Sequence, residues 1–216
     1  MLGRFFDLDA QYRRPSGLLG RYIGGQMARD HRPENEWTVA QLDLKPADHV
    51  LELGCGPGVA LALAVRLVPL GRVVGLDYSR AMVRAARQRN ARAVWRGQVA
   101  LYHGNVARLP FADESFDKAF GIHTIYFWPQ PLAALHEIWR VLKPGGMLTL
   151  TILPEEQWNA GDPTAPVGTP ECRPYTGAEL QHLLADAGFD ALRIAAADDP
   201  ACPSKYCVFG AKSLTA

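Results

Sequence analysis

The chain has 216 residues, of which 48% are hydrophobic and 21% charged, and its formal net charge is +1. This length and composition are typical of one globular domain. The near-neutral charge argues against a large basic surface for nucleic acid. No apolar stretch approaches the roughly 20 residues that span a bilayer, and the N-terminus lacks the apolar core of a signal peptide. We therefore expect a cytoplasmic protein without nucleic-acid or membrane partners.

The first part of the chain mixes aromatic residues, arginines and glycines without a clear strand. Residues 17–30 favour a helix, although Gly24 and Gly25 weaken it. Residues 36–42 (EWTVAQL) have the spacing of a short helix.

From residue 50 onward, short apolar runs alternate with helical patterns. Strands are predicted over residues 50–53, 73–76, 99–102, 118–122, 147–152, 191–194 and 206–210. Helices are predicted over residues 59–68, from a cap at Ser79 to about residue 95, over residues 131–142 (ended by Pro144-Gly145-Gly146), and from a cap at Thr176 to Gly188. Continuously apolar strands separated by helices indicate an α/β fold with a parallel sheet covered on both faces. The last two strands lie too close for a helical crossover and predict an antiparallel hairpin at the edge.

A glycine-rich loop, Gly54-Cys55-Gly56-Pro57-Gly58, follows the first of these strands. In open α/β sheets, ligands bind beyond the carboxyl ends of the strands. The spacing G-x-G-x-G differs from the G-x-G-x-x-G of dinucleotide sites. Glu52 precedes the loop and suits a cofactor that carries an ammonium group and a sulfonium better than a pyrophosphate. Asp77 ends the next strand, where a carboxylate can accept hydrogen bonds from ribose hydroxyls.

These features resemble the class I S-adenosylmethionine (SAM)-dependent methyltransferases, in particular the small-molecule, type 11-like branch. The loop matches the family's E-x-G-x-G-x-G. Further along, residues 104–111 (GNVARLPF) resemble G-D-A-x-x-L-P-F, residues 115–117 match S-F-D, and residues 137–146 (EIWRVLKPGG) resemble E-x-x-R-V-L-K-P-G-G. The likeness covers about residues 45–152. It implies a Rossmann-like, seven-stranded, mostly parallel sheet, with residues 1–45 as a short helical lid and residues 46–216 as the SAM-binding domain.

The resemblance also assigns roles around the cofactor. Glu52, Gly54, Cys55 and Gly56 are expected along the methionine part, and Asp77 at the ribose. The adenine is expected between Tyr78 and Met82, with Asn105 and Val106 at its edge, and His123 is expected as a further cofactor contact. The family usually has Asp at position 105, and an Asn carbonyl can still accept from the adenine amino group, although without charge.

The loop after the fourth main strand, residues 121–128 (GIHTIYFW), lies between the methyl group and the acceptor in this family. His123 is the candidate general base because imidazole titrates near neutral pH, and Tyr126 is a second catalytic candidate. Packing alone would explain either residue. The candidate acceptor or lid contacts are Tyr12, Tyr22, His31, Trp37, Tyr126 and Trp128. No acids cluster at the exit of the fourth strand, so no metal is expected.

Methyl transfer to oxygen, nitrogen or carbon of a small molecule is therefore the first functional hypothesis. Because transfer from a sulfonium needs mainly alignment, the site need not contain a conventional catalytic residue. Two alternatives stay open at this stage. The fold could support a reaction other than methyl transfer, such as a cyclisation or an elimination, or the chain could be a SAM-binding module without catalysis.

Overall fold

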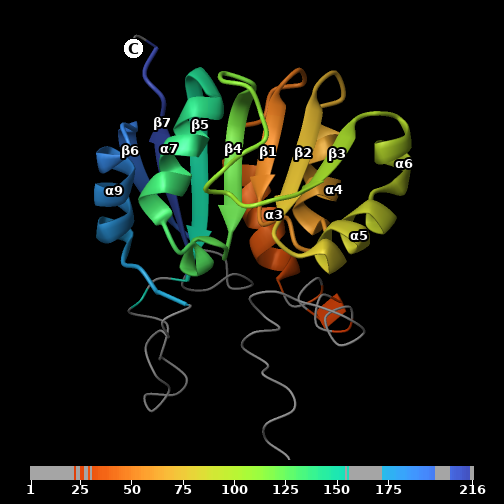
Figure 1. Ribbon diagram of the computed structural model, residues 1–216, viewed down its shortest axis with the longest axis horizontal. Coiled ribbons are helices and arrows are strands. Elements are labelled where there is room, and N and C mark those ends of the chain that lie inside the picture. Colours follow the sequence, from red (N-terminus) through yellow and green to blue (C-terminus); the bar gives the residue numbers. More distant parts are fainter. Residues whose placement is uncertain are drawn as a thin grey trace, which may run out of the picture.

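The structure is a computed structural model that describes residues 31–153, 172–197 and 205–214, together with Tyr22, Gly25, Gln26, Arg29 and Glu155. A seven-stranded sheet lies at its centre, in the order β3-β2-β1-β4-β5-β7-β6 (Figure 1). The strands are β1 (His49–Leu53), β2 (Arg72–Asp77), β3 (Val99–His103), β4 (Phe116–Ile122), β5 (Leu142–Ile152), β6 (Asp190–Ala196) and β7 (Tyr206–Ala211). The described helices are α3 (Arg32–Gln41), α4 (Val59–Leu67), α5 (Arg80–Arg89), α6 (Ala91–Trp95), α7 (Pro131–Val141) and α9 (Gly177–Asp186), with a 3-10 turn over Ile125–Phe127.

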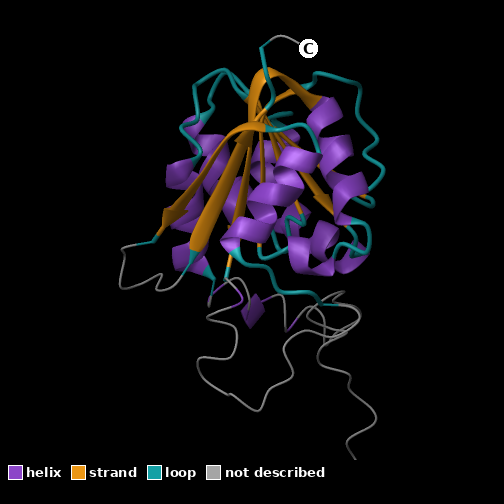
Figure 2. Ribbon diagram, turned by 90° about the vertical axis from the view of Figure 1, so that its left-hand side faces the viewer, coloured by secondary structure: helices purple, strands orange, loops and turns teal. Residues whose placement is uncertain are grey.

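The pairing of the strands confirms the predicted α/β architecture. Strands β1 to β5 pair in parallel, whereas β7 runs antiparallel to both β5 and β6. The C-terminal hairpin is therefore present at the edge of the sheet. Figure 2 views the sheet from its edge and shows helices on both sides of it.

Two hydrophobic clusters fill the space between the sheet and the helices. Side chains alternate along a strand, so Val50 and Leu51 on β1 face opposite layers. Leu51 belongs to the cluster that contains Leu135 of α7 and Leu180 of α9. Val50 belongs to the cluster beneath α3, α4 and α5. Burial on both faces explains why these strands have continuously apolar sequences.

The long helix predicted after Ser79 is wrong, because the structure has two helices there. Ser79 caps α5 as expected, accepting a hydrogen bond from the Met82 backbone N–H at 3.3 Å. The buried Asn90 then leaves helical geometry, with φ −101° and ψ 21°. Its amide donates to the carbonyls of Gly58 and Ala86, each at 3.0 Å. This tertiary contact separates α5 from α6.

Two other predicted boundaries also move. Helix α3 begins at Arg32, four residues before the predicted start at Glu36, and Pro33 lies in its first turn, where proline is tolerated. Strand β5 begins at Leu142, so Pro144-Gly145-Gly146 lies inside the strand, at a register irregularity opposite β4. The cap at Thr176 is confirmed and forms a full capping box with Glu179. The helix predicted over residues 17–30 lies largely outside the described residues, and the boundary at residue 45 stays a prediction.

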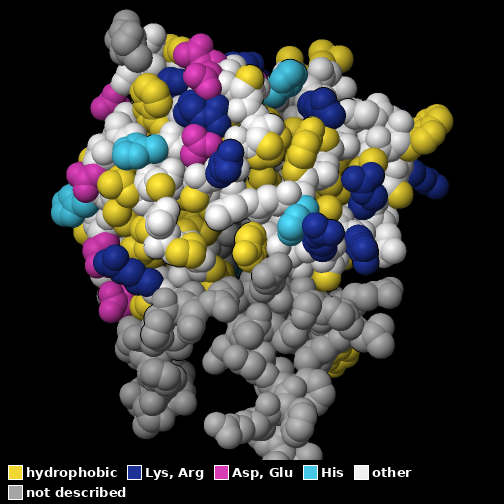
Figure 3. All heavy atoms as spheres, viewed as in Figure 1, with side chains coloured by type: hydrophobic (Ala, Val, Ile, Leu, Met, Phe, Trp, Pro, Cys, Tyr) yellow, Lys and Arg dark blue, Asp and Glu magenta, His cyan; other side chains and the backbone are white. Residues whose placement is uncertain are grey.

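The arginines of α5 lie on its solvent side. Arg80, Arg84 and Arg87 are all exposed. Figure 3 shows the Lys and Arg side chains at this end of the molecule interspersed with hydrophobic and uncharged ones. In the described part of the chain, no helix has both the length and the apolar character needed to cross a bilayer.

Candidate active site

A cavity of about 450 Å³ opens at the carboxyl ends of β1, β2 and β4. This volume lies within the range of small-molecule sites, and the position agrees with the rule for open α/β sheets. The structure brings all the residues predicted for the cofactor to its walls: Glu52, Gly54, Cys55, Gly56, Asp77, Tyr78, Met82, Asn105, Val106 and His123. Sequence segments up to 71 residues apart, from Glu52 to His123, thus form one concave surface.

The glycine loop folds tightly against the sheet. Gly54, Gly56 and Gly58 all have positive φ, at 69°, 48° and 76°. A Cβ at Gly54 would collide with Thr124, which also packs against Gly121 of β4. A Cβ at Gly56, in contrast, would meet no atom within 4 Å. Gly54 is therefore required by the fold, whereas Gly56 leaves open space in the wall of the cavity.

Asp77 fixes this loop from the end of β2. One carboxylate oxygen accepts from the Gly56 N–H at 2.8 Å and the other from the Ser79 N–H at 2.7 Å. Burial raises the pKa of Asp77, although these two N–H groups act in the opposite direction. Each oxygen has a second lone pair, so the carboxylate can still accept hydrogen bonds from a ligand.

Glu52 is a second buried acid on the same wall. Its side chain is 3% exposed, and its Oε2 atom has no hydrogen-bond partner among the described residues. Burial, followed by the charge of Asp77, raises the pKa of Glu52 well above its usual value. A buried carboxyl without a partner is costly, and a cationic ligand group would relieve that cost.

Tyr78, Met82 and Asn105 add both polar and apolar groups to the lining of the cavity. Met82 is buried, whereas Tyr78 is 53% exposed and its ring stacks on His103 at 6.4 Å between centroids. The Asn105 Oδ1 accepts from the Ala107 N–H at 3.0 Å. Asn105 thus builds its own turn and keeps one carbonyl lone pair for a ligand.

The other wall comes from the loop after β4. His123 has φ 52°, a conformation that is uncommon for residues other than glycine, and its backbone N–H donates to the Thr151 carbonyl at 3.0 Å. Burial, together with the charges of His31 and Lys205, lowers the pKa of His123 to about 3. Trp128 lines the cavity and donates to the Thr124 hydroxyl at 3.2 Å.

Tyr126 does not line the cavity, although it was predicted as a catalytic and substrate residue. Its ring is buried, and its hydroxyl donates to the Leu153 carbonyl at 3.1 Å and lies 3.3 Å from His123 Nδ1. Burial raises the pKa of the Tyr126 hydroxyl. Its position therefore supports His123 and does not place it against a substrate.

The predicted lid residues divide into three groups. His31 lines the cavity. Trp37 is half-buried and Tyr22 is 64% exposed, and neither lines it. Tyr12 lies outside the described residues.

Sequence reasoning missed several wall residues, among them Asn35, Pro57, Val59, Leu76, Gly104, Ile122, Thr124 and Pro129. Most of these are neighbours of predicted residues, so extending the loops by one position would have included them. Asn35 is different because it belongs to α3. Only its helical spacing from His31 indicates that the two residues share a face.

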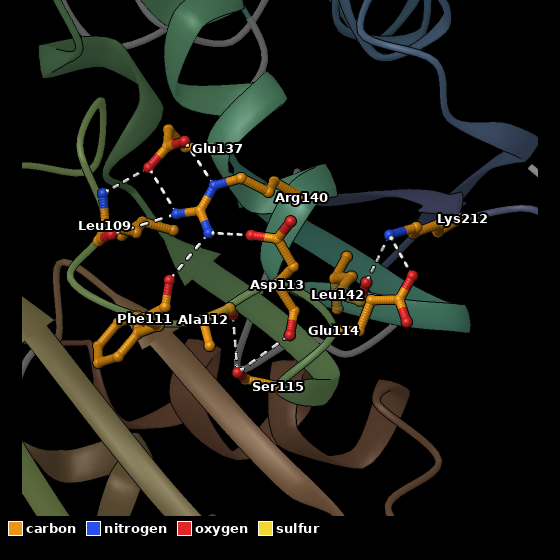
Figure 4. A network of polar contacts seen from close by, with 10 residues as sticks. All are labelled: Leu109, Phe111, Ala112, Asp113, Glu114, Ser115, Glu137, Arg140, Leu142 and Lys212. Atoms are coloured by element: carbon orange, nitrogen blue, oxygen red, sulfur yellow. Dashed lines mark hydrogen bonds and ion pairs between the residues drawn. The ribbon is translucent and has the colours of Figure 1, made fainter.

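An ionic network holds the segment that follows Asn105 (Figure 4). The Arg140 guanidinium on α7 binds both carboxylate oxygens of Glu137, at 2.8 and 2.9 Å. It also donates to the carbonyls of Leu109 and Phe111 and to Asp113. Residues 109–113 are thus tied to α7, which steadies the wall that Asn105 and Val106 provide.

The fold and the position of this cavity are typical of α/β domains that bind a nucleoside-containing cofactor. Comparison with known proteins narrows this class of protein further. Residues 51–150 match the family described as "Methyltransferase domain". The chain is 30% identical over 139 residues to the uncharacterized methyltransferase YdaC of Bacillus subtilis, covering 64% of this chain and 73% of that protein. The chain therefore belongs to the SAM-dependent methyltransferase family.

The chain is also similar to a second curated relative and, in its fold, to a solved structure. Over 150 residues the chain is 41% identical to the demethylmenaquinone methyltransferase of Lactiplantibacillus plantarum, which covers 68% of this chain and 59% of that protein. The chain thus spans about half the length of the first curated relatives it matches, 59% of one and 47% of another. The crystal structure of a SAM dependent methyltransferase from Aquifex aeolicus has the same fold, with a TM-score of 0.73 and 23% identity over 88% of this chain and 97% of that one.

Proposed function

We propose that the protein transfers the methyl group of SAM to a small-molecule acceptor. The observation that carries this proposal is the pair of buried acids, Glu52 and Asp77, on either side of the glycine loop in one cavity. A cofactor with an ammonium group at its amino-acid end and a ribose matches that pair. Membership of the methyltransferase family supports the same donor.

The residues present fit this cofactor. The Oε2 atom of Glu52 has no hydrogen-bond partner among the described residues. It would accept a hydrogen bond from the ammonium group of the methionine part of SAM. Asp77 would accept from the ribose hydroxyls through its remaining lone pairs. The open space at Gly56 lets the backbone lie close to the ligand. Tyr78, Met82, Asn105 and Val106 would then surround the adenine.

When bound, SAM supplies a methyl group that is already activated by its sulfonium. The chain has to align the acceptor with that group and exclude water, and both tasks need shape more than acid–base chemistry. A general base with a pKa of about 3 holds a proton poorly at neutral pH, so burial disfavours that role for His123. We therefore attribute most of the rate to alignment.

We propose an aromatic acceptor. Phe127 and Trp128 line the cavity beside His123 and provide apolar surface for a ring. The reduced (quinol) form of demethylmenaquinone, the compound that the Lactiplantibacillus relative is named for, is the first acceptor to test, because the electron-rich quinol and not the quinone can attack the methyl group of a sulfonium.

The test combines turnover and binding. Mixing the protein with SAM and chemically reduced demethylmenaquinone (the quinol) should yield S-adenosylhomocysteine, measured by mass spectrometry, and a product 14 mass units heavier than the acceptor. SAM alone should raise the melting temperature by mass action. Asp77→Ala should reduce this thermal shift much more than His123→Ala does. No shift at millimolar SAM would refute the cofactor assignment.

The same assay separates the two alternatives. An enzyme that uses the fold for cyclisation or elimination converts its substrate without producing S-adenosylhomocysteine. A binding module shows the thermal shift but no turnover with any acceptor in a panel of quinols, phenols and amines. Formation of S-adenosylhomocysteine in step with a methylated product excludes both.

A further inference from the structure

A cluster of potential ligand atoms lies where His31 and His123 line the cavity. It consists of His31, which precedes α3, Glu34 in the first turn of that helix, and His123 after β4. One ligand atom from each residue lies within 4.8 Å of the other two. The two imidazole rings are 5.4 Å apart between centroids, and His31 Nδ1 is 3.8 Å from a Glu34 oxygen.

These atoms lack the partners that buried polar atoms normally have. Within the described part of the chain, four buried side-chain nitrogen or oxygen atoms have no hydrogen bond, and three of them are His31 Nδ1, Glu34 Oε2 and His123 Nε2. Glu34 is only 9% exposed. Unsatisfied buried groups in folded proteins need an explanation, such as a bound water or ion. Three potential ligand atoms within 4.8 Å of one another favour a cation.

The hydrogen bond of His123 leaves its second nitrogen available as a ligand. His123 Nδ1 lies 3.3 Å from the Tyr126 hydroxyl, which accepts from the Leu153 N–H at 2.5 Å and lies 3.1 Å from the Leu153 carbonyl. In the tautomer that protonates Nδ1, this nitrogen donates to the hydroxyl and Nε2 keeps a lone pair for a ligand. A histidine that binds a metal through one nitrogen usually donates a hydrogen bond through the other.

Thr151 of β5 connects the two segments that carry the cluster. The Thr151 carbonyl accepts from the His123 N–H at 3.0 Å, and the Thr151 hydroxyl lies 2.6 Å from the buried Thr38 hydroxyl on α3. Thr151 thus connects the element that carries His31 and Glu34 with the loop that carries His123. The i, i+3 spacing of His31 and Glu34 puts both side chains on one side of the helix.

We propose that His31, Glu34 and His123 bind a divalent transition-metal ion. Two imidazoles and one carboxylate suit zinc, iron, cobalt and manganese, and such a triad leaves coordination positions open. Bonds of about 2.0–2.2 Å require the ligand atoms to close in from their present separation. The open positions would face the cavity, since both histidines line it.

The role of this ion rests on the proposed function. An acceptor hydroxyl that occupied an open position would lose its proton more readily beside a divalent cation, as metal-bound water does. The acceptor oxygen, its proton having passed to solvent, would then attack the methyl carbon of SAM; the methyl–sulfur bond would break, its electron pair would stay on sulfur, and S-adenosylhomocysteine would leave. This assigns His123 to holding the ion and not to removing the proton. It also opposes the expectation that no metal binds, which considered only acids at the exit of β4.

One cation already competes for the cluster. Lys205 Nζ lies 3.7 Å from Glu34 Oε1, and the lysine side chain is only 15% exposed. Its charge would repel a metal ion. Replacing Lys205 with an uncharged residue of similar length should therefore increase the affinity for the metal. If Glu34 and Lys205 form only a structural ion pair, the same replacement would not increase metal affinity.

The test is calorimetric titration of Zn²⁺ into the full chain after chelation of bound metal and removal of any histidine tag. We expect one site, and His31→Ala and Glu34→Gln should each weaken it by at least about tenfold. His136→Ala, which changes an exposed histidine on α7, is the matched control and should leave it unchanged. Lys205→Gln should tighten it. A Co²⁺ spectrum without a thiolate band would exclude the cysteines as ligands.

Two results would overturn the proposal: no Zn²⁺ binding by the unaltered protein, or equal loss of affinity in His136→Ala and His31→Ala. The SAM thermal shift, measured on every variant, reports folding and cofactor binding separately. If SAM binds but Zn²⁺ does not, the metal site fails while the proposed function stands. If Zn²⁺ binds but SAM does not, the proposed function fails while the metal site stands.

Discussion

Gly56→Ala and Gly97→Ala form a matched pair that locates the cofactor. Both glycines have positive φ, 48° and 74°, and a Cβ at either position would meet no atom within 4 Å. Only Gly56 lines the cavity. Alanine in the left-handed region costs about 1–2 kcal/mol, partly offset by about 0.4–1 kcal/mol from the less flexible unfolded chain. Each variant should therefore lose about 1 kcal/mol, or about 2–4 °C in melting temperature.

Their responses to SAM should differ. A ligand at 100 times its Kd stabilises the folded state by about 2.7 kcal/mol, which corresponds to about 5–11 °C for a chain of this size. Gly97→Ala should keep this response. In Gly56→Ala the methyl group occupies the space of the ligand, and a tenfold weaker Kd removes about 1.4 kcal/mol, roughly half of the shift. The backbone N–H of residue 56, which donates to Asp77, is kept in both variants. A difference in SAM affinity between them therefore does not come from loss of this hydrogen bond.

The assay is a thermal melt of each variant over a series of SAM concentrations, fitted for Kd. An unchanged SAM response in Gly56→Ala would place the cofactor elsewhere in the molecule. An equal loss in Gly97→Ala would show that backbone strain, and not contact with the ligand, caused the effect. Either result would refute the reasoning about the glycine loop.

Two other changes test how the walls are held. Arg140→Ala should lower the free energy of unfolding by about 2 kcal/mol, because its hydrogen bonds to charged and carbonyl groups are partly buried. Arg87→Ala on the exposed side of α5 should change it by less than about 0.5 kcal/mol. The hydrogen bond from Arg140 lowers the pKa of Glu137, so this stabilisation is present above the ordinary glutamate pKa and is lost as the pH falls through the lowered value. The free energies of unfolding of Arg140→Ala and of the unaltered protein should thus become more similar in acid. Urea titrations at several pH values would measure this. Asn90→Ala removes the buried amide that donates to the Gly58 carbonyl and should cost about 1–2 kcal/mol in the same titration. No loss in Asn90→Ala would mean that the tertiary hydrogen bond does not fix the start of α4.

The cofactor side of the cavity could be predicted because its signals are local. Each parallel strand ends at the same edge of the sheet, so residues that follow separate strands meet there without any further information. Glu52, Asp77 and Asn105 each follow or end a strand that the sequence pattern identifies. The glycines between them need positive φ, which few other residues tolerate. Strand pattern and loop chemistry were therefore enough.

Element boundaries that depend on distant contacts could not be predicted in this way. Asn90 ends α5 because its amide reaches the carbonyl of Gly58 on another element. The residues around it have ordinary helix propensity, so the pattern predicts one continuous helix. Pro144-Gly145-Gly146 remains within β5 for a similar reason, since an irregularity in register accommodates it. Local propensity is weaker than tertiary context at both places.

The cluster of His31, Glu34 and His123 is built from segments that share no local signal. His31 immediately precedes α3, Glu34 lies in the first turn of that helix, His123 follows β4, and the neighbouring Lys205 precedes β7. Their meeting depends on how α3 docks, which the buried Thr38 and Thr151 hydroxyls help to set. His31 appeared among the predicted lid residues only through the family resemblance. Glu34 was not predicted at all.

The backbone of His123 offers a last test of why a histidine occupies this position. A residue other than glycine at φ 52° is uncommon, but asparagine and histidine both adopt this region more often than most residues, so His123→Asn keeps the backbone and changes only the ring. If packing alone kept the histidine, His123→Asn would cost more than about 2 kcal/mol. If its Nε2 lone pair is the reason, the lost packing should cost little, because the ring is only half-buried. We expect the free energy of unfolding in urea to change by less than about 1 kcal/mol, while Zn²⁺ binding is lost. A large loss of stability would instead assign His123 to the core.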